Sequence, residues 1–507
     1  MFKRSTKNLD RTALTLIVIL SLAIGFLLTQ SGQAIARVRD FTWQARQVGA
    51  ADSAFILSFS RPMDKASVEE NLQIDPPLPG KFSWAGRRMA YTLESPIPYG
   101  QTFELSLKGG RDRFSPPDDA RLQMRPFTSE FQSRDRVFVY LGVEGDEAGR
   151  LVLLNLTRQE QKILTPPNLL VMDFKPYPEN DRILFSAIEQ SSGTRRSLGD
   201  QQLYTVSTGI RIQPPDSLIG AVSQRAERNA TATPQSAGVV ELVLDNRDYQ
   251  NLKFDLSPNG KTIVVQRVNQ QNPADFGLWI LQPGEPARPI ETEPGGDFLI
   301  APDSQSLAMS QGQGMAILPL ESGADPLDFL PRYGMILSFA RDGTAAAMVR
   351  FNRNPENPTR SLFLITNQGT EQELLEIDGS FLDAQFDPNK RNLYCLLTRR
   401  IPGDVYLEQP YLTAINLDSG EVVDLLKLPI QQDIQMNLSP DGLAVLFDQA
   451  ISDADVNADG VIRGRDGKAI ASSKLWILPI VEDDQGIPLQ AQPQEVGVAG
   501  LRPRWLP

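Results

Sequence analysis

The sequence of 507 residues contains no histidine and a single cysteine. Without histidine it cannot form a Ser-His-Asp or Cys-His nucleophile system, a histidine-containing zinc site or the usual proton shuttle near neutral pH. A single cysteine excludes intrachain disulfides and all-cysteine metal sites. Cationic residues are in the minority, since 50 Lys and Arg oppose 62 Asp and Glu, a net charge of −12. This balance argues against nucleic acid as a partner.

Several catalytic signatures are missing as well. The chain has no Gly-x-Ser-x-Gly nucleophile elbow, no phosphate-binding glycine-rich loop and no sialidase-type Asp-box. Cys395 falls within an expected strand, where a thiol is usually a small core residue. Ser473 and Lys474 lie at an expected strand start, which favours a solvated pair over a catalytic dyad. The sequence therefore favours a protein without enzymatic activity.

The chain begins with a cationic flank followed by its most uniformly apolar segment. Four lysines and arginines within residues 3–11 precede an apolar run over 13–28. Extended to residues 12–29, this run is just long enough to cross a hydrocarbon core. Because cationic flanks stay in the cytoplasm, the bulk of the chain is expected in the periplasm or an equivalent lumen, anchored by a segment within residues 1–36. The alternative is a cleaved signal peptide, since Ala34-Ile35-Ala36 has the small-x-small form of a cleavage site.

Residues 38–130 have the pattern of a small antiparallel β-sandwich. Apolar and polar residues alternate in short segments around 55–60, 89–93 and 103–107, and Pro and Gly residues separate them. The run Phe59-Ser60-Arg61-Pro62-Met63-Asp64 resembles the SbsA-type bacterial immunoglobulin-like domain, over about 75 residues of the chain. Such domains mostly serve as spacers or adhesion modules in surface proteins. The resemblance therefore implies an immunoglobulin-like unit without an active site.

A repeated phrase fills residues 136–507. It consists of a bulky apolar residue, any residue, Pro and a polar turn, followed by a hydrophobic strand. Its Pro positions are 176, 258, 302, 388 and 440, and a weaker copy carries Arg341 in place of Pro. A second phrase follows several copies, as in Gly277-Leu278-Trp279-Ile280-Leu281 and Lys474-Leu475-Trp476-Ile477-Leu478. Three or four strands per unit, repeated about every 45 residues, are typical of a β-propeller.

Two copies of the phrase read Leu-Ser-Pro-[Asn/Asp]-Gly, at 256–260 and 438–442. They resemble the TolB-like, WD-repeat-like propeller families, in which Ser-Pro-Asp-Gly is the commonest form of this turn. The resemblance covers residues 136–507 and implies an all-β ring of blades.

The last residues of the chain predict how the ring closes. Trp505-Leu506-Pro507 reads as another copy of the phrase without its following strand, and residues 137–141 can supply that strand. The C-terminus would then form the innermost strand of the first blade, which leaves no long sheet edge. Counting 507 as an anchor gives seven blades. Six blades remain if the weak copy at Arg341 is spurious.

One segment carries a metal-binding pattern. Residues 455–466 match the D-x-N-x-D-G core of a calcium loop and resemble EF-hand and dockerin-type loops. The expected ligands are the side chains of Asp455, Asn457, Asp459 and Asp466 and the carbonyl of Val461. Asp466 replaces the usual Glu, and two arginines add positive charge. The predicted Ca²⁺ ion is structural, and the alternative is a solvated, Asx-rich turn between two strands.

These features predict a non-enzymatic scaffold that is anchored in the membrane and binds a protein or polysaccharide of the cell envelope through its propeller. One alternative is a glycan hydrolase or lyase that uses carboxylates in the propeller funnel. Carboxylates lie beside the anchors, but such acids commonly cap turns and the sequence pairs no two of them: Asp173, Asp255, Asp297, Asp383 and Asp387. Another alternative is an adhesion or surface-layer component. A deep pocket with paired carboxylates would favour hydrolysis, and a shallow face lined by Arg or aromatic residues would favour protein binding.

Overall fold

The computed structural model of the chain separates into two compact units. The first unit comprises Met1–Ile97 and Gln101–Ser133, and the second comprises Pro98–Gly100 and Arg134–Pro507. The structure describes residues 13–22, 35–114, 122–190, 198–210, 236–321, 323–324, 326–352, 358–403, 405–431, 433–453 and 469–507.

Residues 13–22 are helical, and the remainder of the predicted span at 12–29 lies outside the described residues. Among the described helices, none combines the length and the apolar character that a membrane crossing requires.

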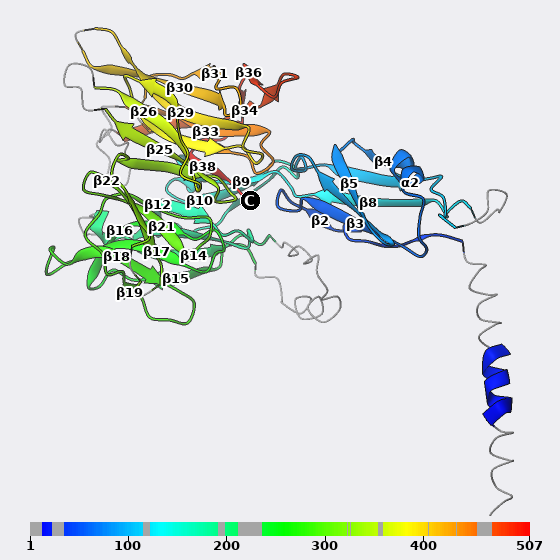
Figure 1. Cartoon of the computed structure of the whole chain (residues 1–507). Helices are drawn as coiled ribbons and strands as arrows, with labels where there is room; N and C mark the ends of the chain where they lie inside the picture. The colour runs from blue at the N-terminus through cyan, green and yellow to red at the C-terminus, as the bar shows by residue number, and fades with distance from the viewer. Residues whose placement is uncertain are drawn as a thin grey trace, which may run out of the picture. The chain divides into compact units, whose positions relative to one another are not determined.

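The first unit contains two four-stranded sheets and the helix α2 (Lys65–Asn71) (Figure 1). In spatial order, the first of these sheets contains β1 (Val38–Phe41), β3 (Ala54–Phe59), β6 (Arg88–Leu93) and β5 (Gly80–Ala85). The other contains β2 (Gln47–Val48), β8 (Phe127–Ser133), β7 (Thr102–Leu107) and β4 (Leu72–Asp75). The three predicted alternating segments are therefore strands β3, β6 and β7.

Alternation buries one face of each of these strands in an aromatic core. Phe55 packs against Trp43, and Phe103 stacks on Phe131 at 5.3 Å between ring centroids. The Pro-Met-Asp segment begins helix α2, where the Asp64 Oδ1 atom accepts a hydrogen bond from the Ser67 backbone N–H at 2.8 Å. This is a helix cap, and it gives the segment a structural role.

The described residues of the second unit contain seven four-stranded antiparallel sheets. The first sheet contains β38 (Gly500–Trp505), β9 (Val137–Gly142), β10 (Leu151–Asn155) and β11 (Glu160–Ile163). The second contains β12 (Leu169–Pro176), β13 (Arg182–Glu189), β14 (Gln202–Ser207) and β15 (Val240–Leu244). The third contains β16 (Tyr249–Leu256), β17 (Ile263–Asn269), β18 (Phe276–Leu281) and β19 (Arg288–Pro289).

The fourth sheet contains β20 (Phe298–Ile300), β21 (Ser306–Gln311), β22 (Gly314–Pro319) and β23 (Asp328–Leu330). The fifth contains β24 (Met335–Phe339), β25 (Ala345–Phe351), β26 (Arg360–Thr366) and β27 (Glu371–Ile377). The sixth contains β28 (Phe381–Phe386), β29 (Asn392–Ile401), β30 (Leu407–Asn416) and β31 (Val422–Lys427). The seventh contains β32 (Met436–Leu438), β33 (Ala444–Asp453), β34 (Ala469–Pro479) and β37 (Gln494–Glu495).

The smaller elements of the second unit are η1 (Gly145–Glu147), η2 (Leu198–Asp200), β35 (Val481–Glu482) and β36 (Pro488–Leu489). Repeated four-stranded antiparallel sheets are the building unit of a β-propeller. The second unit therefore has the β-propeller architecture that the repeated phrase predicts.

The Ser-Pro-Asx-Gly phrase forms the turn between the first and second strands of a sheet. In the third sheet, the Ser257 backbone N–H donates to the Thr262 carbonyl at 2.8 Å, and the Ser257 Oγ atom accepts from the Thr262 N–H at 2.9 Å. Gly260 closes the turn with φ +68°, a conformation that favours glycine. Ser439 and Gly442 repeat these bonds in the seventh sheet. The local sequence thus encodes the hairpin.

Apolar clusters join each sheet to the next. The second and third sheets share one cluster, and equivalent clusters lie between each later pair up to the sixth and seventh. A further cluster joins the first and second sheets. The seventh and first sheets also share a cluster, to which Leu446 and Leu475 contribute from one side and Phe138, Tyr140 and Trp505 from the other. Every sheet in this series is therefore covered on both faces.

The C-terminal strand β38 pairs antiparallel with β9, as predicted for the chain's last residues (Figure 1). Trp505 lies opposite Phe138, and their rings meet edge to face at 5.5 Å. On its other side β38 bonds to the seventh sheet, because the Asn437 Oδ1 atom accepts from the Trp505 N–H at 2.7 Å. The buried Asp448 carboxylate also accepts from the Arg502 N–H at 2.7 Å. The strand thus joins the first sheet to the seventh.

Replacing Trp505 tests the contribution of this strand to stability. Because Trp505 is only 5% exposed, we expect Trp505→Ala to lower the free energy of unfolding by about 3–5 kcal/mol. Urea denaturation of the full chain would measure the loss. The control is Leu327→Ala, at a residue that is 61% exposed, and it should change stability by less than about 0.5 kcal/mol. Equal effects of the two substitutions would contradict a packing role for Trp505.

Asp448 makes stability depend on pH. Burial raises its pKa to about 6, although the N–H groups of Gln435 and Arg502 act to lower it. A raised pKa in the folded state means that the folded protein binds this proton more tightly than the unfolded chain does. The contribution is therefore present below the unfolded pKa near 3.8 and is lost as the pH rises through about 6.

We expect this pH-dependent part of the free energy of unfolding to amount to about 3 kcal/mol, because the pKa of Asp448 is about 6 in the folded chain and near 3.8 in the unfolded chain. It should be absent from Asp448→Asn, which cannot ionise. The measurement is urea denaturation of both chains at several pH values between about 4 and 7. Parallel stability curves for the two chains would contradict the prediction.

Candidate functional site

The first strands of the sheets carry the carboxylates that the sequence singles out. From β16 to β38, the first strands of successive sheets contact one another, which places them at the centre of the unit. Two lysines connect the neighbouring first strands here. Lys175 on β12 forms an ion pair with Asp255 on β16, and Lys253 on β16 forms one with Asp297, just before β20. Sequence analysis identified the carboxylates but not these lysines.

The side chains of these carboxylates accept hydrogen bonds from backbone N–H groups of the chain. The Asp255 Oδ2 atom accepts from the Ile300 backbone N–H at 2.8 Å, on the next sheet. Asp173 accepts from the N–H of the residue that follows it, at 2.9 Å. Burial, together with Lys175, lowers the pKa of Lys253 to about 8. Asp255 and Asp297 thus connect neighbouring sheets, and Asp173 is bonded within its own strand, which favours a structural role for all three.

The remaining two carboxylates, Asp383 and Asp387, belong to β28 of the sixth sheet and the turn that follows it. Asp383 accepts from the Ala384 N–H and from the Gln385 side chain, both at 2.8 Å, and burial raises its pKa. Asp387 closes the turn after β28 by accepting from the Arg391 N–H at 2.8 Å, and burial raises its pKa to about 6. Each carboxyl is engaged in its own sheet.

Other sequence candidates also have structural surroundings. Cys395 lies in β29 in an apolar cluster, and burial raises the pKa of its thiol. The Ser473 hydroxyl donates to the Gly500 carbonyl, and Lys474 pairs with Glu495 at 3.0 Å. Ser473 and Lys474 therefore each interact with a different residue and not with each other.

The predicted calcium loop at 455–466 lies outside the described residues. The residues that flank it are described, and Asp453 at the end of β33 pairs with Ala469 at the start of β34. Within the ranges that the structure describes, no three Asp, Glu or Cys side chains are grouped so that they could hold a metal ion.

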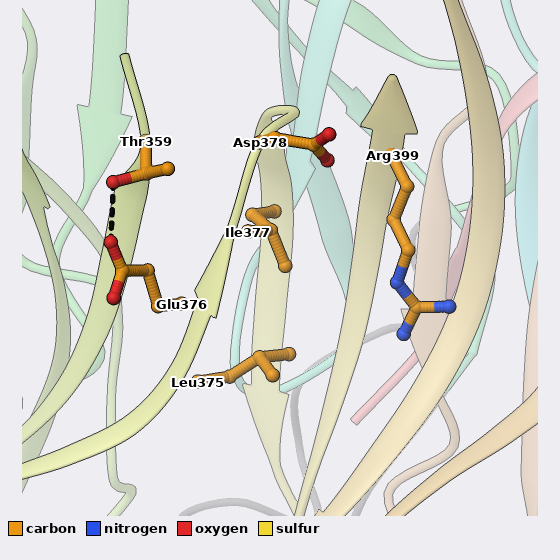
Figure 2. A pocket seen from close by; sticks show the side chains of 6 residues that line it. All are labelled: Thr359, Leu375, Glu376, Ile377, Asp378 and Arg399. Carbon is orange, nitrogen blue, oxygen red and sulfur yellow. Dashed lines mark hydrogen bonds between the residues drawn. The ribbon is translucent and has the colours of Figure 1, made fainter. Parts of the chain in front are cut away.

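An open depression lies at the junction of the fifth and sixth sheets. Its volume is about 470 Å³, and it is lined by Thr359, Leu375, Glu376, Ile377, Asp378 and Arg399. Figure 2 shows Leu375 and Ile377 projecting from β27 toward the strand that carries Arg399, with Glu376 turned toward Thr359. The floor is thus apolar, and charged groups surround it.

Hydrogen bonds hold the charged groups of the depression in place. The Glu376 Oε1 atom accepts from the Thr359 hydroxyl and, at 3.1 Å, from the Asn352 side-chain amide. Asp378 accepts from the Arg400 backbone N–H at 3.3 Å. Arg399 donates to both oxygens of Asp424, at 2.5 and 2.9 Å. Although burial acts to raise the pKa of Asp424, these bonds hold it below its usual value.

Beside the depression lies a surface that we call the Arg–aromatic edge. It consists of Phe351, Arg360, Arg400, Val405, Tyr406 and Leu407. Arg360 lies 5.8 Å from the Phe351 ring centroid, and Arg400 lies 5.6 Å from that of Tyr406. Val405 is 68% exposed and Tyr406 is 60% exposed.

Strand pairing makes the edge and the depression continuous. Phe351 pairs with Arg360, which in turn pairs with Ile377 in the depression. Arg360 also donates to the Gly379 carbonyl, and in the sixth sheet Ile401 pairs with Leu407. Exposed apolar side chains and arginines beside a shallow depression are typical of protein-binding surfaces.

Comparisons with known proteins yield structural likenesses of low identity. No family model and no curated protein matches the sequence. The chain is similar in structure to TolB from Acinetobacter baumannii, with 11% identity, a TM-score of 0.38 and coverage of 86% of this chain and 83% of that one. It is also similar to an oligogalacturonate lyase from Vibrio parahaemolyticus, with 11% identity, a TM-score of 0.42 and coverage of 62% and 86%.

A third similar structure is the periplasmic gluconolactonase of Pseudomonas aeruginosa, with 14% identity, a TM-score of 0.40 and coverage of 74% of this chain and 99% of that one. At these identities and TM-scores, no activity or partner follows from the likenesses.

Proposed function

We propose that this protein is a non-enzymatic scaffold outside the cytoplasm, which binds another protein of the cell envelope through the Arg–aromatic edge and the adjoining depression. The main support is that Val405 and Tyr406 are exposed together with two arginines that lie over aromatic rings. Aromatic residues and Arg are enriched where proteins bind one another, because they bury large areas and offer directed hydrogen bonds.

The propeller is proposed to be a closed ring of seven blades. The pairing of β38 with β9 and the apolar cluster between the seventh and first sheets support closure. A closed ring has no long sheet edge that could pair with other chains. A partner would then bind at the exposed strand ends, where the Arg–aromatic edge lies.

The state of the first-strand carboxylates also supports binding rather than catalysis. A glycan hydrolase needs two carboxyl groups that flank the scissile bond in a pocket, one as acid and one as base or nucleophile. Asp255 and Asp297 form ion pairs with lysines, and Asp383 is bonded to its own strand. The described depression is open, and its carboxylates come from the outer strand β27 and the residue after it.

The proposed cellular localisation rests on the N-terminal segment. The cationic flank and the apolar run favour a membrane anchor over residues 12–29, with the rest of the chain in the periplasm or an equivalent lumen. The first unit is proposed to be an SbsA-type immunoglobulin-like spacer, because it combines two four-stranded sheets with the Phe-Ser-x-Pro-Met-Asp run.

Photo-crosslinking tests the proposed binding surface. A benzophenone amino acid placed at Tyr406 of the full chain should crosslink to a distinct envelope protein in intact cells. The same group at Lys162, on the exposed outer strand β11 of the first sheet, should not. We expect the product to be lost in the double variant Val405→Asp with Leu407→Asp, because charges replace the apolar contacts. Crosslinking that is equal at both positions, or that persists in the double variant, would disprove the proposal.

Calcium binding by the loop at 455–466 is proposed on its ligand spacing alone. Ligand binding to the folded state raises its stability. We therefore expect millimolar Ca²⁺ to raise the melting temperature of the full chain, and Asp455→Asn with Asp459→Asn to abolish this rise. The matched control, Asp483→Asn with Asp484→Asn, should retain it. Identical melting temperatures of the unsubstituted chain with Ca²⁺ and with a chelator would refute a structural ion.

A further inference from the structure

We infer that the depression receives a basic side chain from an extended segment of the partner protein, and that apolar residues beside that side chain pack on the Arg–aromatic edge. This inference rests on the proposed function and specifies the chemistry of the partner. It follows from the charges that line the depression, the apolar floor between them and the exposed side chains next to it.

The charge of the depression is negative. Its one lining cation, Arg399, donates two hydrogen bonds to Asp424 and also interacts electrostatically with Asp378, so the lining holds two carboxylates and one guanidinium. Among the described residues, Glu376 and Asp378 form no ion pair within 4.0 Å. A cationic side chain would therefore meet two carboxylates, whereas an acidic one would be repelled by both.

Both carboxylates are held in position before a partner arrives. The Thr359 and Asn352 side chains donate to Oε1 of Glu376, and the Arg400 N–H donates to Oδ1 of Asp378. Because each of these bonds uses one oxygen, the other oxygen of each carboxylate can accept from an ammonium or guanidinium group. Preorganised acceptors reduce the entropy lost on binding.

The apolar floor suits the stem of a long basic side chain. Leu375 and Ile377 are two residues apart on β27 and therefore face the same side of the strand. Lys and Arg bury their methylene groups against apolar surfaces while the charged end reaches polar groups. The volume of about 470 Å³ exceeds what one side chain fills and leaves room for its neighbours.

Of the two arginines of the edge, Arg360 has a carboxylate beside it and Arg400 has an aromatic ring. Arg360 lies beside the Glu408 carboxylate, whose pKa stays below its usual value because bonds from Thr398 and Tyr406 and the charge of Arg360 outweigh burial. Arg400 lies over the Tyr406 ring, next to the exposed Val405. The edge therefore offers apolar and aromatic contacts, and the depression has one more carboxylate than it has guanidinium groups in its lining.

The test uses the full chain and a fluorescent peptide of alternating lysine and leucine, with binding measured by fluorescence anisotropy. We expect Glu376→Gln with Asp378→Asn to weaken binding at least about tenfold. The matched control is Glu241→Gln with Asp328→Asn, which removes the same charge from the outer strands β15 and β23. It should leave the affinity within about twofold. A peptide of alternating glutamate and leucine should not bind.

Equal losses in the two double variants would show non-specific attraction to the acidic chain and would overturn the inference. Binding of the glutamate peptide as tight as that of the lysine peptide would also overturn it. The crosslink at Tyr406 separates the two proposals. Suppose that the crosslink persists while Glu376→Gln with Asp378→Asn binds the lysine peptide normally. In that case the inference of a basic partner segment is wrong, and the proposed binding surface is retained. If the crosslink is absent, the proposed function itself fails.

Discussion

The second unit depends on apolar contacts between successive sheets and on the strand that joins its last sheet to its first. Strand β9 is buried at all six of its positions, so both of its faces need cover. The apolar clusters shared with the second and seventh sheets cover the two faces of β9, and β38 pairs with its edge while its own N–H groups bond to the seventh sheet. Since apolar burial is the dominant favourable term in folding, the pairing of β38 with β9 and the cluster between the seventh and first sheets contribute to the stability of this unit.

The same contacts separate the centre of the unit from the proposed binding surface. The centre of the unit is crossed by ion pairs such as that of Lys175 with Asp255, and by side-chain bonds from Gln385 and Asn437 to the next first strand. Such bonds fix the first strands and engage their polar groups. At the strand ends of the fifth and sixth sheets, by contrast, Val405 and Tyr406 are exposed beside an open depression.

The proposed contacts divide affinity and specificity between two kinds of surface. Apolar and aromatic side chains of the edge contribute area, and the carboxylates of Glu376 and Asp378 select the charge of the partner. The chain is acidic as a whole, so long-range attraction favours basic partners before contact is made. The ordered carboxylates then act at short range, where salt screens them less.

The strands, the turns and the all-β class could be predicted from the amino-acid sequence, because they depend on residues close together in the chain. Ser257 and Gly260 form their turn through bonds within six residues, and the apolar strands around it follow the repeated phrase. The depression and the Arg–aromatic edge, in contrast, exist only in the folded chain. Phe351 meets Arg360, and Asp378 meets Arg400, once strand register is set, and no local pattern encodes such contacts across strands and sheets.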